Sequence, residues 1–164
     1  MNSNIPNEGS VTVIGKGAFS SCWDLESIVI PNAVVEIDDY AFRDCSNLMR
    51  VEIGDSVKRI GNWAFEDCGY LKFLTIGDRV ETIGCWAFAN CYSLETIEIP
   101  KSVTHIYEGA FFTWTSDEGK IYLEDVNSVW DAFSSYDDGY IEGITPNAYQ
   151  LRKEYHKFIF KKRT

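Results

Sequence analysis

Histidine is scarce in this chain of 164 residues, which contains only His105 and His156. The sequence also lacks a paired-cysteine motif and a glycine-rich phosphate loop. His105 falls at a variable position and is expected on the surface. The segment Asp137-Asp138-Gly139 lacks the alternating ligand spacing of a calcium loop. The sequence therefore predicts no catalytic residues, no metal site and no cofactor, and it indicates that the protein is not an enzyme.

Long apolar runs are also lacking. No segment approaches the roughly 18 consecutive apolar residues that a membrane-spanning helix requires. The first 20 residues contain neither a basic n-region nor an apolar h-region, so no signal peptide is expected in them. These observations predict no membrane span. They are compatible with a cytoplasmic protein and equally with an exported protein whose signal has been removed.

Basic residues are fewer than acidic residues. The chain has 15 Lys and Arg residues against 25 Asp and Glu residues, a formal net charge of -10, and the basic excess is confined to residues 145–164. Because affinity for phosphate backbones comes from cationic side chains, the acidic body disfavours direct nucleic-acid binding. Two interpretations remain open: a solvated surface that keeps the protein soluble, or a surface matched to a basic partner protein.

What the sequence does contain is a repeat of 23 residues, whose fixed positions are nearly all apolar or turn residues. An Ile opens each unit, and Ala-Phe, Cys, Leu, a pair of apolar residues and then Pro or Gly follow at constant offsets. The opening positions are Ile14, Ile37, Ile60, Ile83 and Ile106. Since no unit of this size can bury its own apolar edge, the repeat predicts coils that are stable only when stacked.

The apolar spacing within one unit predicts its local structure. Leu-x-x-Ile-x-Ile ends with period-two spacing and indicates a short strand. The Val-x-x-Ile segment that follows indicates a second short extended piece. Ala-Phe-x-x-Cys-x-x-Leu spaces its apolar residues in a way that suits a helical turn.

Four of the five cysteines recur at the repeat period and should form a column through the stack: Cys22, Cys45, Cys68 and Cys91. Parallel side chains on neighbouring coils keep their Cβ atoms about 4.8 Å apart, whereas a disulfide prefers about 3.8 Å. A column of buried free thiols is the better interpretation. Cys85 lies outside the column and is expected to be exposed.

The consensus I-G-x-x-A-F-x-x-C-x-x-L-x-x-I-x-I-P-x-x-V-x-x-I resembles the Treponema pallidum-type, or BspA-like, leucine-rich repeat. The match runs from about Val11 to Ile106, and more loosely to Leu123. The resemblance implies a right-handed superhelical solenoid with short parallel strands on its concave face. It also implies a family of mostly surface-exposed or secreted proteins of bacteria and parasitic protists, used in adhesion and protein binding, which leaves the location open.

Three parts are predicted along the chain. Residues 1–13 form an N-terminal cap or partial repeat, residues 14–124 a solenoid of about five repeats, and residues 125–164 a C-terminal cap. The fifth unit is atypical, because Trp114 replaces its Cys and one residue is inserted around Ser116-Asp117-Glu118-Gly119. In the cap, Thr145-Pro146 is a favourable helix start, and a helix near residues 146–160 is expected to seal the core. A basic amphipathic helix that contacts a membrane or target is the alternative.

Residues that flank the central apolar position of each long strand should point away from the core. Phe73 and Tyr122 break an otherwise polar pattern there and are plausible binding anchors, although Phe73 could instead simply cover a neighbouring coil. The predicted binding residues of this strand face are Arg50, Glu52, Phe73, Thr75, Thr96, Glu98, Lys120 and Tyr122.

A second aromatic column precedes the Ala-Phe pairs and consists of Tyr40, Trp63 and Trp86. Packing between adjacent coils and a second binding strip are both compatible with this pattern.

The function predicted from these features is a non-enzymatic module, monomeric or weakly dimeric, that binds a protein partner through its strand face in an adhesin-like or surface-recognition role. The alternative is a small acidic cytoplasmic inhibitor, or decoy, that occupies a basic and nucleic-acid-binding site on its partner. An enzyme that uses Cys85 or a column cysteine is a third hypothesis and would require an activated thiolate.

Overall fold

The structure, a computed structural model, describes residues 2–4, 11–94, 96–107, 109–111, 120–123 and 161–162. Within these ranges the chain forms strands and turns, and no helix. The helix predicted near residues 146–160 and the segment Asp137-Asp138-Gly139 lie outside the described residues. No helix long and apolar enough to cross a membrane is found in the described part.

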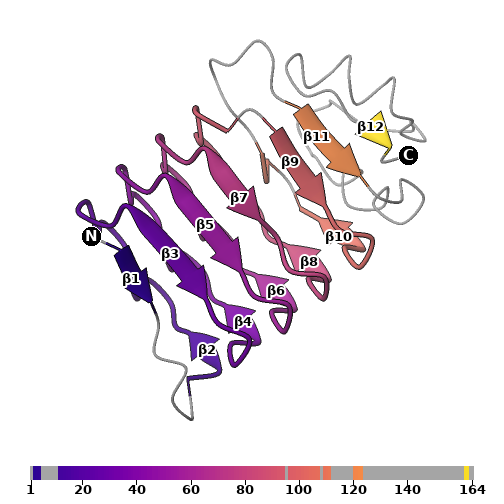
Figure 1. Cartoon of the computed structure of the whole chain (residues 1–164), viewed down its shortest axis with the longest axis horizontal. Coiled ribbons are helices and arrows are strands. Elements are labelled where there is room, and N and C mark those ends of the chain that lie inside the picture. The colour runs from indigo at the N-terminus through magenta and orange to yellow at the C-terminus, as the bar shows by residue number, and fades with distance from the viewer. Residues whose placement is uncertain are drawn as a thin grey trace.

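The longer strands form one side of a parallel solenoid (Figure 1). A 4-stranded sheet has the order β1-β3-β5-β7, and a 3-stranded sheet has the order β12-β11-β9. All of their pairings are parallel. The longer strands are β1 (Asn2–Asn4), β3 (Ser27–Ile30), β5 (Arg50–Ile53), β7 (Phe73–Thr75), β9 (Thr96–Ile99) and β11 (Lys120–Leu123), and the two-residue strand β12 (Lys161–Lys162) pairs with β11.

The short extended segments form a second parallel sheet of 5 strands, in the order β10-β8-β6-β4-β2. They are β2 (Val13–Ile14), β4 (Glu36–Ile37), β6 (Arg59–Ile60), β8 (Thr82–Ile83) and β10 (His105–Ile106). Each coil therefore contributes one strand to each side, which confirms the solenoid predicted from the repeat.

Strand register follows the repeat, and it changes where the repeat changes. Ser27 pairs with Arg50, one 23-residue unit further along. Asn2 pairs with Ser27, so the first coil contains two residues more than the unit. Thr96 pairs with Lys120, which accommodates the one-residue insertion predicted in the fifth unit.

A ladder of phenylalanine rings runs through the centre of the stack. Neighbouring centroids lie 5.0 Å apart for Phe19 and Phe42, 4.9 Å for Phe42 and Phe65, and 5.1 Å for Phe65 and Phe88, with nearly parallel planes. One coil therefore advances by about 5 Å, the spacing of hydrogen-bonded strands. Aliphatic side chains surround the ladder and are fully buried, among them Ile28, Ile37, Leu48, Ile60, Leu71, Ile83 and Ile97.

The cysteine column is part of this core. Cys45, Cys68 and Cys91 are buried and unpaired by disulfides, and each thiol donates a hydrogen bond to a Phe carbonyl oxygen of the preceding coil, at 3.1–3.4 Å. Burial raises the pKa of Cys45 to about 12, and burial also raises the pKa values of Cys68 and Cys91. The structure confirms that Cys68 is a packing residue.

The position of Cys85 corrects one expectation. This residue is partly buried, not exposed. Its backbone N–H donates to the Asn62 side chain of the preceding coil at 2.8 Å, so the turn that carries Cys85 lies close against its neighbour.

The Ala-Phe segment is not the helical turn that its apolar spacing suggested. The N–H of Ala41 donates to Asp38 and that of Arg43 to Tyr40, but the intervening N–H of Phe42 donates to Ala64 of the next coil. Tyr40 and Asp44 have φ of 59°, in the left-handed region. Because left-handed residues interrupt a right-handed helix, the segment becomes a run of tight turns whose alternate N–H groups bind the adjacent coil.

Candidate functional site

The strand face is the outward surface of the longer strands, and its columns are aligned as predicted. Arg50 pairs with Phe73, and Glu52 pairs with Thr75. These side chains are exposed while the alternate residues of β5, Val51 and Ile53, are buried. The alternation expected of a strand with one face in the core is therefore confirmed here.

Two positively charged side chains lie near Phe73 on this face. Its side chain is 49% exposed. The Arg50 guanidinium of the preceding coil lies over the ring, 4.7 Å from its centroid, and the Lys72 ammonium lies 5.8 Å away. Arg50 also approaches Glu52, at 3.8 Å. Arg50 thus partly covers the Phe73 ring, which still presents an aromatic surface bordered by two positive charges.

The second half of the face begins at β9. Thr96 pairs with Lys120 and Glu98 with Tyr122, and Glu98 is exposed. The side chains of Thr96, Lys120 and Tyr122 lie outside what the structure describes. The described residues of β7 and β9 form no ladder with each other, so the face is divided between two sheets. Repeat spacing alone predicted a continuous row and carried no signal of this division.

The second aromatic column is packed between coils. Tyr40 and Trp63 stack with their centroids 5.1 Å apart and their planes at 1°. Lys16 and Arg43 lie over the Tyr40 ring, at 5.6 and 5.8 Å. Tyr40, Trp63 and Trp86 are all half-buried. Packing between coils is therefore observed for Tyr40 and Trp63. A binding role for the partly exposed column remains a prediction.

The ends of this column offer a matched pair of variants. Gly17 and Gly109 occupy the same repeat position and share φ of 63°. A Cβ at Gly109 would lie 2.7 Å from the Trp86 ring, whereas at Gly17 its nearest neighbour would be 4.0 Å away. Gly109→Ala is expected to lower the free energy of unfolding by about 1 kcal/mol more than Gly17→Ala, as measured by urea unfolding. Both substitutions place an alanine in the left-handed conformation, but only Gly109→Ala also displaces the Trp86 ring. Equal losses would show that Trp86 moves aside freely.

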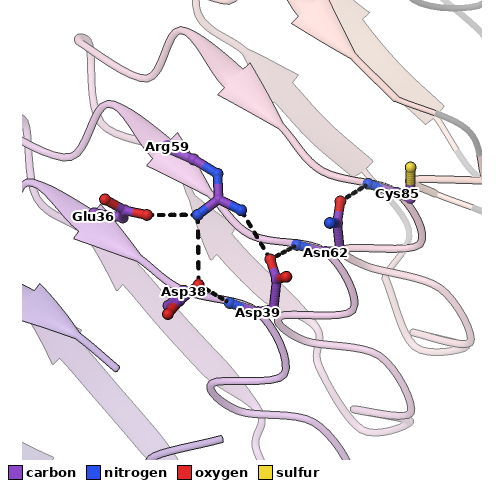
Figure 2. A network of polar contacts seen from close by, with 6 residues as sticks. All are labelled: Glu36, Asp38, Asp39, Arg59, Asn62 and Cys85. Carbon is purple, nitrogen blue, oxygen red and sulfur yellow. Dashed lines mark hydrogen bonds and ion pairs between the residues drawn. The ribbon is translucent and has the colours of Figure 1, made fainter. Parts of the chain in front are cut away.

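A polar network joins the coils on the side of the shorter strands (Figure 2). The Arg59 guanidinium donates to Glu36 at 2.5 Å and to Asp39 at 2.9 Å, and it lies 3.5 Å from Asp38. Burial acts to lower the pKa of Arg59, but the bonds to these carboxylates outweigh it and raise that pKa. The network joins one cation and three acids that no sequence motif marks as a group.

The same network continues as a ladder of side chain to backbone bonds. Asp39 Oδ1 accepts from the N–H of Asn62 at 2.7 Å, and Asn62 Oδ1 accepts from the N–H of Cys85 at 2.8 Å (Figure 2). Asp39 and Asn62 occupy the same repeat position, and both side chains readily accept bonds from backbone N–H groups, so this pair was the sequence signal for the ladder. Its bonds fasten adjacent coils. In the described part of the chain, no group of three or more His, Cys, Asp or Glu residues could hold a metal ion.

The fold is a parallel solenoid of 23-residue coils. Each regular coil places a Leu, a Phe and a Cys in the core, and this arrangement defines a leucine-rich-repeat protein. A family model described as BspA type leucine rich repeat region matches residues 2–131 in 6 copies. The chain therefore belongs to this family, and the resemblance found in the repeat is confirmed.

Two solved structures have a similar fold. The leucine rich repeat protein of T. pallidum is 28% identical with a TM-score of 0.67, and the match covers 74% of this chain and 58% of that one. A leucine rich cell surface protein of Faecalibacterium prausnitzii is 32% identical with a TM-score of 0.67, over 82% of this chain and 35% of that one. This chain is thus matched to only part of each. No significant match was found among curated proteins.

Proposed function

We propose that this chain is a protein-binding repeat module that uses its strand face, with Phe73 as the central anchor. The observation that carries the proposal is the exposed Phe73 ring held beneath Arg50 on a sheet whose other outward residues are mostly polar. Exposed aromatic side chains on a rigid surface are typical anchors of protein interfaces. Membership of the leucine-rich-repeat family supports a binding role, because solenoids offer extended surfaces of this kind.

The local charge suggests which partner fits. Arg50 and Lys72 border the Phe73 ring, although the whole chain has a net charge of -10. A partner segment that combines an apolar side chain with nearby carboxylates complements this spot. The decoy hypothesis requires a basic partner instead, and the cations around Phe73 would repel such a partner.

The test is capture of partners by the immobilised chain from lysate and surface fractions of cells that encode it, beside three variants. Phe73→Ala removes the anchor and Lys72→Glu reverses the charge beside it. Lys58→Glu makes the same charge change at an exposed residue that immediately precedes the shorter strand β6. We expect the first two variants to weaken the captured complex by about tenfold, the effect of losing a typical anchor, and Lys58→Glu to leave it unchanged.

Each other outcome has a definite meaning. Equal capture by all four chains would contradict the strand-face proposal. Stronger capture by Lys72→Glu would indicate a basic partner and would favour the decoy hypothesis. Binding lost with Lys58→Glu alone would place the interface on the opposite sheet.

A further inference from the structure

Three exposed amphipathic rings lie in the turns that lead into the longer strands. Trp23 is 59% exposed, Tyr70 is 62% exposed and Tyr92 is 44% exposed. They precede β3, β7 and β9 respectively, so they line one edge of the solenoid beside the strand face. We call these three residues the turn platform. Every ring in the platform carries a polar group as well as an apolar face.

Two of these rings contact an adjacent coil. The indole N–H of Trp23 donates to Asp44 Oδ2 at 3.2 Å, and the Trp23 carbonyl oxygen accepts from the Asn47 side chain at 2.7 Å. Tyr92 lies against Gly69 of the preceding coil, where a Cβ would be 3.5 Å from the tyrosine ring. Because its ring N–H is bonded, Trp23 loses little conformational freedom when a ligand binds, which favours affinity.

The spacing of the platform matches a polymeric ligand. Trp23 and Tyr92 occupy the same repeat position three coils apart, and the phenylalanine ladder gives about 5 Å per coil. In an extended β-linked chain, one pyranose sugar advances by about the same distance as one coil. Such a chain lying along the solenoid axis would therefore keep one sugar in step with each coil.

The polar surroundings suit sugar hydroxyl groups and oppose negative charge. Asn47 and Asp24 are exposed at the repeat position of Tyr70, and Glu26 is exposed two residues beyond Asp24. Their amide and carboxylate oxygens can accept hydrogen bonds from hydroxyls, and amide N–H groups can donate to ring oxygens. Asp24, Glu26, Asp44 and Asp67 outnumber the cations Arg43 and Lys72 among the described residues of this edge, so uronate or sulfate groups would be repelled.

We propose that the turn platform binds an extended, uncharged chain of β-linked pyranose sugars, with sugar C–H faces stacked on Trp23, Tyr70 and Tyr92. This site is separate from the strand face and does not depend on the function proposed above. It adds a class of ligand, a neutral glycan, to a module for which protein binding is proposed.

The experiment is titration calorimetry of the full chain with β-1,4-linked glucose oligosaccharides, from the disaccharide to the hexasaccharide. Affinity should rise with length up to the tetrasaccharide, which reaches from the Trp23 coil to the Tyr92 coil, and then level off. The triple variant Trp23→Ala, Tyr70→Ala, Tyr92→Ala should bind the tetrasaccharide at least about tenfold more weakly. Tyr107→Ala, which removes an exposed ring beside β10 of the other sheet, is the matched control and should bind it unchanged.

Circular dichroism and urea unfolding would verify that the triple variant remains folded. Loss of binding with the fold intact, together with no binding of a β-linked polyuronate, would support the proposal. No measurable binding of any uncharged oligosaccharide by the natural chain would overturn it, as would equal binding by the triple variant. If the platform variants instead abolished capture of a protein without any oligosaccharide binding, the platform would be a protein-docking surface.

Discussion

Phe65→Ala is expected to lower the free energy of unfolding by about 3–5 kcal/mol, the usual cost of removing a buried phenylalanine. Phe65 is fully buried and stacks on Phe42 and Phe88, at 4.9 and 5.1 Å. Its removal leaves a cavity at the middle of the ladder and ends both contacts. Because each coil is stable only against its neighbours, the loss should also reduce the cooperativity of unfolding.

Urea unfolding followed by circular dichroism measures this effect, and Phe73→Ala provides its control. That substitution is chemically identical and lies in the same coil, but the Phe73 ring is half exposed on the strand face. It is expected to cost less than about 1 kcal/mol. A similar loss for the two variants would contradict the central role of the ladder.

Raising the pH above about 9 is expected to destabilise the protein steeply, because its core contains three thiols. Burial raises the pKa of Cys45 from 9.0 to about 12 and also raises the pKa values of Cys68 and Cys91. Between these values, the unfolded chain loses thiol protons that the folded chain retains. The unfolded state then binds fewer protons, so stability declines as the pH rises.

The stability contributed by these thiols is fully present below about pH 9 and is lost as the pH rises through the folded-state values. Each thiol should contribute a slope of about 1.4 kcal/mol per pH unit, which gives about 4 kcal/mol per unit for the three together. The measurement is urea unfolding at several pH values with a reducing agent present. Cys68→Ala should reduce the slope by about one third, whatever it does to stability at neutral pH.

Tyrosine and lysine also titrate in this range, but they are common to both chains, so the difference between the two slopes isolates the thiol. Identical slopes would mean that Cys68 ionises as easily in the folded protein as in the unfolded chain. That outcome would revive the hypothesis of a reactive cysteine.

The sequence by itself determined the coil and its core. A constant period of 23 residues places Phe65 over Phe42 and Cys68 over Cys45, because equivalent residues of stacked coils must be neighbours. The same period aligns the strand-face columns, and it predicted the pairing of Thr96 with Lys120 once the insertion was counted. Apolar periodicity is a local signal that every coil repeats, so it identified the buried positions, although the spacing of the Ala-Phe segment suggested a helical turn that does not form.

Only the tertiary structure decided what happens between unlike residues of neighbouring coils. The left-handed conformation of Tyr40 and Trp63 is not evident from these residues themselves, because neither is glycine, and only Gly17 and Gly109 at the same repeat position signal it. The placement of Arg50 over Phe73 is likewise set by a contact across coils.

The bonds from Arg59 to Glu36, Asp38 and Asp39 show why the sequence alone does not predict such contacts. These residues lie more than 19 positions from Arg59 in the sequence and meet only because stacking brings successive coils to within about 5 Å. The repeat therefore predicts which positions face one another, while the particular side chains that occupy those positions decide the turns, the polar network and the exposed surfaces on which binding depends.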